Sequence, residues 1–168
     1  QGMLLEGLRY RWAAMNPPLT DEEDAGSIGS EPLDPALADR FAYVVDMPSW
    51  KSLQQGDQTA IIVSETGPLD RSGDQVLVKA LASAKAALPS VKGAMADGIA
   101  VYVRTLVALL AQAGINLSPR RAGILFRSLL AVHAASLALD PSSRPSDSAL
   151  LAVQNGLPQR AQGIAIPG

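Results

Sequence analysis

Two polar side chains in the first quarter of the chain stand where a ligand could be held. Asn16 follows a short, mostly apolar run at residues 10–15, and Arg40 directly precedes a second apolar run at residues 41–47. Both runs are typical of buried strands, and the two prolines after Asn16 end the first one because they lack backbone donors. An amide and a guanidinium at neighbouring strand ends can project from one sheet edge, where open α/β sheets bind ligands.

A third candidate lies much further along the chain, at the start of a helical stretch. Ser118 has the side chain of an N-cap, and Pro119 fits the first turn, where a missing N–H costs little. Arg120 and Arg121 follow at once. A guanidinium in this position would lie at the N-terminal end of a helix, where it could contact a ligand or another segment of the chain.

The elements that must position these side chains are mainly helices. Apolar residues at helical spacing predict helices over 69–88, 95–113, 119–139 and 147–155. Pro89 should stop the first, Gly114 should cap the end of the second, and Asp140 should close the third. Ser146 should cap the start of the fourth.

The third predicted helix has an inner face made by Leu125, Leu129, Val132 and Ser136. A short helix over 35–39 has a proline in its first turn.

Three motifs in this order resemble the second half of an AAA+ ATPase module, closest to the MoxR-like branch. They are Ala-Ala-Met-Asn-Pro-Pro at 13–18, Leu-Asp-Pro-Ala-Leu-Ala-Asp-Arg-Phe at 33–41 and Leu-Ser-Pro-Arg-Arg at 117–121. The resemblance implies an α/β fragment, the end of an AAA+ parallel sheet core, followed by an all-α helical lid domain. Residues 1–48 would belong to the core, 49–68 to a connector with a polar, irregular stretch at 54–58, 69–160 to the lid and 161–168 to a tail.

The same resemblance implies a role for each candidate residue. Asn16 would be the sensor 1 residue that orients the attacking water, and Arg40 the arginine finger that acts on the nucleotide of a neighbouring subunit. Arg120 would be the sensor 2 residue, which leaves Arg121 as a surface or interface residue. The residues alone also allow simpler readings, in which Asn16 initiates a turn, Arg40 pairs with Asp39 or Asp34 and both later arginines are solvated.

Parts of such a module are missing from the sequence. No Gly-x-x-x-x-Gly-Lys-Ser/Thr loop occurs, and no apolar strand ending in Asp-Glu precedes Arg11. The resemblance therefore implies that ATP and Mg²⁺ are bound mainly by a half of the module outside this sequence. By itself the chain should neither hydrolyse ATP nor bind it tightly.

Composition limits the other classes of function. Hydrophobic residues make up 48% of the 168, enough for a packed core, while a net charge of −2 argues against a nucleic-acid surface. No run of about eighteen uninterrupted apolar residues occurs, so no membrane span is predicted. The chain has no cysteine, and its single histidine, His133, is expected to be packed or half-exposed; no metal site is predicted.

Two function classes stay open after this reading. In the first, the chain is part of a cytoplasmic ATPase ring, commonly a hexamer, which remodels or matures partner proteins, often ones with von Willebrand factor A domains. In the second, it is a non-catalytic helical module that binds other proteins. A nucleic-acid binder that uses Arg120, Arg121 and Arg127 is disfavoured by the acidic balance of the chain.

Overall fold

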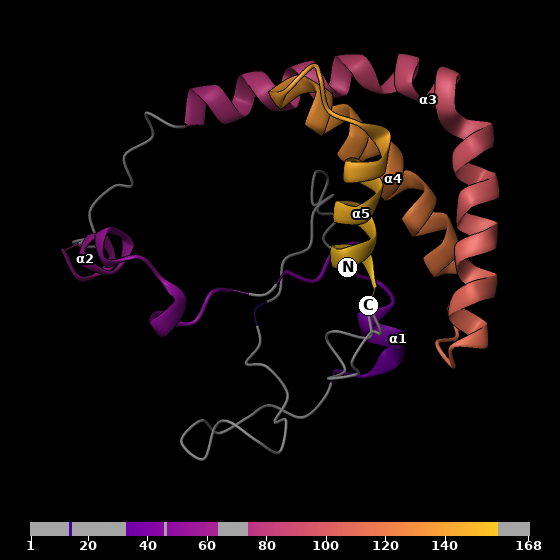
Figure 1. Ribbon diagram of the computed structural model, residues 1–168, viewed down its shortest axis with the longest axis horizontal. Coiled ribbons are helices and arrows are strands. Elements are labelled where there is room, and N and C mark those ends of the chain that lie inside the picture. Colours follow the sequence, from indigo (N-terminus) through magenta and orange to yellow (C-terminus); the bar gives the residue numbers. More distant parts are fainter. Residues whose placement is uncertain (1–13, 15–32, 46, 64–73, 158–168) are drawn as a thin grey trace, which may run out of the picture.

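The computed structural model describes residues 14, 33–45, 47–63 and 74–157 (Figure 1). Its elements are α1 (Pro35–Ala38), the 3-10 helix η1 (Trp50–Ser52), α2 (Gln55–Val63), α3 (Asp74–Gln112), α4 (Pro119–Leu139) and α5 (Pro145–Gly156). Helix accounts for 76% of these residues and no strand occurs among them, so the described part is all-α. The helical character expected for the second half of the chain is confirmed over 74–157.

The strand predicted at residues 41–47 is wrong for 41–45 and 47, which are the positions described there. This segment follows an irregular path, and the N–H of Val44 donates to the carbonyl of Asn155 in α5 at 2.7 Å. A strand needs an adjacent strand for its backbone groups, and here a helix carbonyl takes one of them. The strand predicted at 10–15 lies outside the described residues except for Ala14, which has no regular structure.

The short helix predicted before Arg40 is confirmed as α1. Asp34 caps it, because its Oδ1 accepts the N–H of Leu37 at 3.0 Å, and Pro35 takes the first helical position. The helix ends after one turn, so Arg40 follows in an exposed turn.

The two helices predicted on either side of Pro89 are one helix, α3, and the predicted stop is wrong. Pro89 has no N–H for the carbonyl of Lys85, and its ring crowds that carbonyl, an arrangement that bends a helix without ending it when packing holds the next turns. Figure 1 shows α3 turning a corner part-way along, with α4 and α5 inside the angle. Beyond the proline, α3 is held by burial of Val91, Ile99 and Val103 in the core.

The end of α3 is the glycine cap that the sequence predicts. Gly114 has φ +82°, and its N–H donates to the carbonyl of Ala111 at 3.1 Å. The N–H of Ile115 reaches back to the carbonyl of Leu110 at 2.8 Å, which completes a Schellman motif. Ile115 is itself buried, so the motif turns the chain and starts the next layer of packing.

The core lies where α4 packs against both α3 and α5. Ser118 caps α4 as predicted, because its Oγ accepts the N–H of Arg121 at 3.0 Å. Leu125 and Leu129 of the predicted inner face are fully buried, whereas Val132 and Ser136 are half-buried. The buried apolar residues of this core are Val91, Ile99, Val103, Leu125, Leu129, Leu130, Ala134, Ala152 and Leu157.

The polar stretch at 54–58 is helical in large part, so its prediction as irregular is wrong. Residues 55–63 form α2, which contains no buried residue and lies apart from α3, α4 and α5 in Figure 1. Ile61, Ile62 and Val63 remain exposed on it.

The predicted cap of the fourth helix is also wrong. α5 begins at Pro145 with Arg144 in the N-cap position, and Arg144 makes no side-chain cap hydrogen bond. The hydroxyl of Ser146 lies inside the first turn and donates to Oδ1 of Asp147 at 3.2 Å. The proline at the first position fixes the start of this helix earlier than the serine would.

Two of the helices are long and apolar enough to cross a membrane, which the search for uninterrupted apolar runs did not predict. They are α3 over residues 75–112 and α4, each of which contains an apolar stretch of 18 residues, with a mean hydropathy of 1.6 and 1.7 respectively. Length and composition alone are weak evidence, because core helices of soluble proteins have the same properties. α4 in particular carries the core residues Leu125, Leu129 and Leu130.

Alanine should have opposite effects at two glycines, one in the cap that ends α3 and one in the interior of that helix. Gly114→Ala should lower the free energy of unfolding by about 1–2 kcal/mol, because an L-residue is strained at positive φ. Gly93→Ala, within α3 and with open space around its Cβ, should raise it by about 0.5–1 kcal/mol. Urea denaturation of both variants measures the difference, and equal effects would contradict the cap.

Candidate functional site

The predicted site residues differ in their exposure and in the contacts that they make. Arg40 and Arg120 are both exposed, and neither forms an ion pair with any of the described residues. Asn16 lies outside the described residues, so its predicted role stays a prediction. The buried and hydrogen-bonded side chain in this region is that of Arg121, the residue after Arg120.

Arg121 is buried, with 1% of its surface exposed, so the expectation that it is a surface or interface residue is wrong. Its Nε donates to Oδ1 of Asp39 at 3.2 Å, and its Nη2 donates to the carbonyl of Ala38 at 2.9 Å. Its Nη1 donates to the carbonyls of Phe41 at 2.8 Å and Gly156 at 3.1 Å. One guanidinium thus joins α4 to residues 38–41 and to the end of α5.

Ser118 completes this network from the start of α4. Its Oγ accepts the N–H of Arg121 at 3.0 Å and donates its own proton to Oδ2 of Asp39 at 2.7 Å. Both oxygens of Asp39 are therefore bonded, one to the guanidinium and one to the cap hydroxyl. We call these three side chains, Asp39, Ser118 and Arg121, the clamp.

The electrostatics of the clamp follow from its burial. Burial lowers the pKa of Arg121, and the hydrogen bond and the negative charge of Asp39 act in the opposite direction. An arginine stays protonated in proteins under ordinary conditions, so the charge must be met inside the fold. Asp39 and the three carbonyls meet it, which satisfies the rule that buried charges are paired and hydrogen-bonded.

The clamp brings the two exposed arginines into one region of the molecule. Arg40 is bonded in the chain to Asp39, and Arg120 is bonded to Arg121, so each stands one residue from a partner in the ion pair. Both guanidiniums keep their donors free of ion pairs among the described residues. Forked N–H donors of this kind match phosphate and carboxylate oxygens.

Sequence reasoning missed Arg121, although a signal was present. Arg121, Leu125 and Leu129 are spaced four residues apart, so they lie on the same stripe of α4. The N-cap at Ser118 fixes where the helix starts, which puts Arg121 at the inward-facing end of that stripe. An arginine in line with two core leucines predicts a buried charge that needs an acid.

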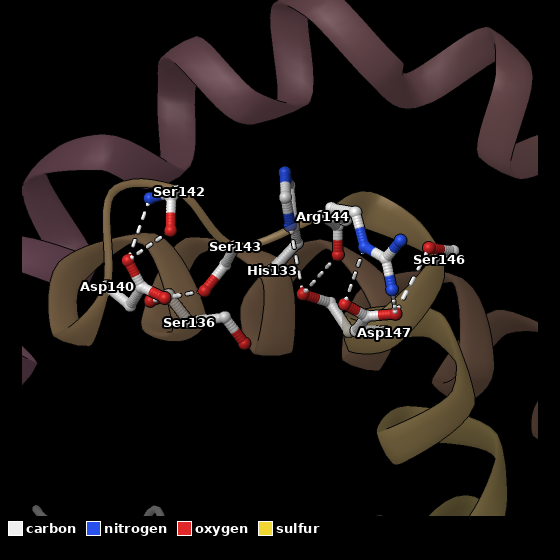
Figure 2. Close-up of polar contacts among 9 residues, drawn as sticks. His133, Ser136, Asp140, Ser142, Ser143, Arg144, Ser146 and Asp147 are labelled. Atoms are coloured by element: carbon white, nitrogen blue, oxygen red, sulfur yellow. Dashed lines mark hydrogen bonds and ion pairs between the residues drawn. The ribbon is translucent and has the colours of Figure 1, made fainter.

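A second polar group is buried between α4 and α5. His133, 6% exposed, has its Nδ1 3.0 Å from Oγ of Ser148, which is 3% exposed. The Ser148 hydroxyl also lies 3.4 Å from the carbonyl of Arg144. The expectation of a packed histidine is confirmed, and the histidine rests against the first turn of α5 (Figure 2).

The turn that leads into α5 is held by its own side chains (Figure 2). Oδ1 of Asp140 accepts both the N–H of Ser142 at 2.9 Å and its hydroxyl at 2.7 Å, and these bonds lower the pKa of Asp140. Arg144 forms two parallel bonds with Asp147, each of 3.0 Å. All four side chains are exposed, which makes this a surface turn and not a candidate site.

The described residues offer no grouping of three histidine or acidic side chains that could hold a metal ion. No protein-family model, no curated protein and no solved structure matches the chain. Function therefore has to be argued from the clamp, the exposed arginines and the sequence motifs.

The clamp predicts a characteristic pattern in a double-mutant cycle. Asp39→Ala should cost about 3–5 kcal/mol of unfolding free energy, because it leaves the buried guanidinium without its counterion. Adding Arg121→Met to that variant should restore part of the loss, since an apolar side chain of similar length needs no counterion. Chemical denaturation of the two single variants and the double variant measures the coupling.

Arg120→Met is the matched control on the same turn of α4. Because Arg120 is exposed, its replacement should change the unfolding free energy by no more than about 0.5 kcal/mol. A cost for Arg121→Met as small as that of the control would rule the clamp out.

Proposed function

We propose that the chain is the C-terminal portion of a MoxR-like AAA+ ATPase, which couples ATP hydrolysis to remodelling or maturation of partner proteins. The observation that carries the proposal is the clamp. It ties the Asp-Arg-Phe triplet that contains Arg40 to the first turn of the helix that starts with the Ser-Pro-Arg motif. Two motifs about eighty residues apart are thus held together by their own side chains.

Arg40 fits the part of an arginine finger by its chemistry and its exposure. It follows the single turn of α1, and the clamp holds the residue before it, so the base of the side chain is fixed while its end is open to a neighbour. A planar guanidinium can bond two oxygens of a terminal phosphate at once. Such a contact is worth roughly 10³ to 10⁵ in rate for phosphoryl transfer.

Arg120 fits the part of a residue that reports on the same phosphate from the lid. It lies in the first turn of α4, where the helix dipole favours an anion. A rotation of α4 would move Arg120 directly. It would also move Asp39, which is bonded to Ser118 and Arg121. Because Arg40 follows Asp39 in the chain, Arg40 would move with it.

The remaining parts of this proposal come from the resemblance. ATP with Mg²⁺ would supply the terminal phosphate, and would be held mainly by the part of the module that this chain lacks. Asn16 would orient the attacking water. The chain would assemble with neighbouring subunits into a ring in the cytoplasm. Its client would be a protein such as one with a von Willebrand factor A domain.

One observation favours a second candidate function, that of a helical protein-binding module. The first half of α3 carries Val76, Leu77, Val78 and Leu81, each more than half exposed. Of these, Leu77, Val78 and Leu81 are neighbours on the helix surface, and exposed apolar residues of this kind are typical of surfaces that another protein covers. A module of this kind would bind its partner without any dependence on Arg40.

The ATPase proposal is tested by Arg40 in the full-length protein. Arg40→Ala should lower the ATP turnover number by about 10³-fold or more while nucleotide affinity stays within a few-fold, because a finger acts mainly on the transition state. Arg40→Lys should not restore turnover, since an ammonium lacks the planar fork. Steady-state phosphate release and nucleotide titration give the two numbers.

Arg127→Ala is the matched control, because Arg127 is exposed on the same helix as Arg120 but lies away from the clamp. It should leave turnover unchanged. Unaltered turnover in Arg40→Ala would remove the finger role of Arg40. Absence of any ATP turnover in the full-length protein would remove the ATPase assignment and leave the protein-binding module as the surviving candidate.

A further inference from the structure

A cleft of about 440 Å³ opens between α3, α4 and the start of α5, away from the clamp. Its volume lies within the range of small-molecule sites in proteins. The wall is mainly apolar and holds no Lys, Arg, Asp or Glu among the described residues. The residues that matter for a ligand are Met95, Gly98, Ile99, Tyr102, Leu129 and His133.

His133 gives this cleft its one buried polar group. The side chain is more than nine-tenths buried, and its Nδ1 is engaged by Ser148 at 3.0 Å. The other ring nitrogen, Nε2, points away from that contact toward α3 (Figure 2), whose residues form the opposite wall of the cleft. Among the described residues Nε2 has no hydrogen-bond partner, and a buried polar atom without one is costly.

The hydrogen bond at Nδ1 determines what Nε2 can accept or give. If the Ser148 hydroxyl donates to Nδ1, then Nε2 carries the proton and donates. If Nδ1 donates to Ser148, whose hydroxyl then turns to the carbonyl of Arg144, Nε2 is an acceptor. A hydroxyl group serves both tautomers, because it can donate and accept.

We propose that the cleft binds a small neutral phenol, with the ligand hydroxyl bonded to Nε2 of His133. A ligand with a single aromatic ring suits the walls, since that ring can contact the thioether of Met95 and the aromatic ring of Tyr102. The lack of charged side chains in the wall disfavours carboxylates and phosphates. This site is independent of the ATPase assignment, because it shares no residue with the clamp, Arg40 or Arg120.

The chain contains a single histidine, so its imidazole nitrogens can be followed by NMR without assignment variants. Phenol is titrated into the intact chain at about pH 8.5, below the pKa of a phenol, so the ligand is neutral. The Nε2 resonance should shift in a saturable way with a Kd of about 1 mM, as expected for a ligand of this size. Toluene, which has a methyl group in place of the hydroxyl, should bind about tenfold more weakly and leave Nε2 unshifted.

Two glycines of α3 supply matched variants. A Cβ at either Gly98 or Gly93 would meet no atom within 4 Å, but only Gly98 lines the cleft. Gly98→Leu should weaken phenol binding at least tenfold, whereas Gly93→Leu should leave it unchanged. Circular dichroism checks that both variants fold.

Several results would overturn the proposal. They are no saturable shift with phenol, an equal response to toluene, or unaltered binding in a folded Gly98→Leu variant. A His133 shift that depends on protein concentration without phenol would assign the cleft to contacts between copies of the chain instead. The comparison of phenol with toluene needs no variant, so it decides the matter even if Gly98→Leu fails to fold.

Discussion

The burial of one guanidinium, that of Arg121, determines how the segment before α2 sits on the helices. Apolar packing is limited there: Ala38 is buried, Leu33, Phe41 and Val44 are half-buried, and Leu37, Tyr43 and Val45 are exposed. The segment is held instead by the carboxylate of Asp39 and by main-chain carbonyls. Without a charge that demands these partners, nothing in the apolar pattern would place residues 38–41 at this end of α4.

The buried ion pair fixes the position of the segment more than it adds to the free energy of unfolding. Taking both charges out of water costs free energy that their attraction roughly repays, so a buried pair is weak evidence for a stable fold. What it provides is a fixed register, because four donors of one planar group must find four acceptors in set directions. Gly156 shows how tight the fit is, since a Cβ there would lie 3.0 Å from Leu125.

Local features of the fold followed well from the sequence, whereas features set by distant partners did not. The caps at Ser118 and Gly114 depend on residues within one turn, and both were predicted. The cap at Asp34 is equally local, but only the helix that it starts was predicted. The continuation of α3 through Pro89 depends on core contacts with α4, which no local pattern contains.

The errors at the other sites have the same origin. The apolar run at 41–47 looks like a strand, but its described residues meet a helix end in place of a second strand. Burial of Arg121 needs an acid 82 residues away, and only its spacing from Leu125 hinted at it. In the candidate site, Arg40 and Arg120 are exposed, their roles remain predictions, and the clamp between them was not foreseen.

That separation of 82 residues between Asp39 and Arg121 also bears on the order in which the molecule forms. Contacts between α3 and α4, and between α4 and α5, join helices that follow one another in sequence, so they can form while the chain before them is still free. The segment at 33–45 then closes a long loop onto a helix end that already presents its arginine. On opening, the same segment can leave first as a unit, with the three-helix core intact, so hydrogen exchange at Val44 would precede exchange in the middle of α4.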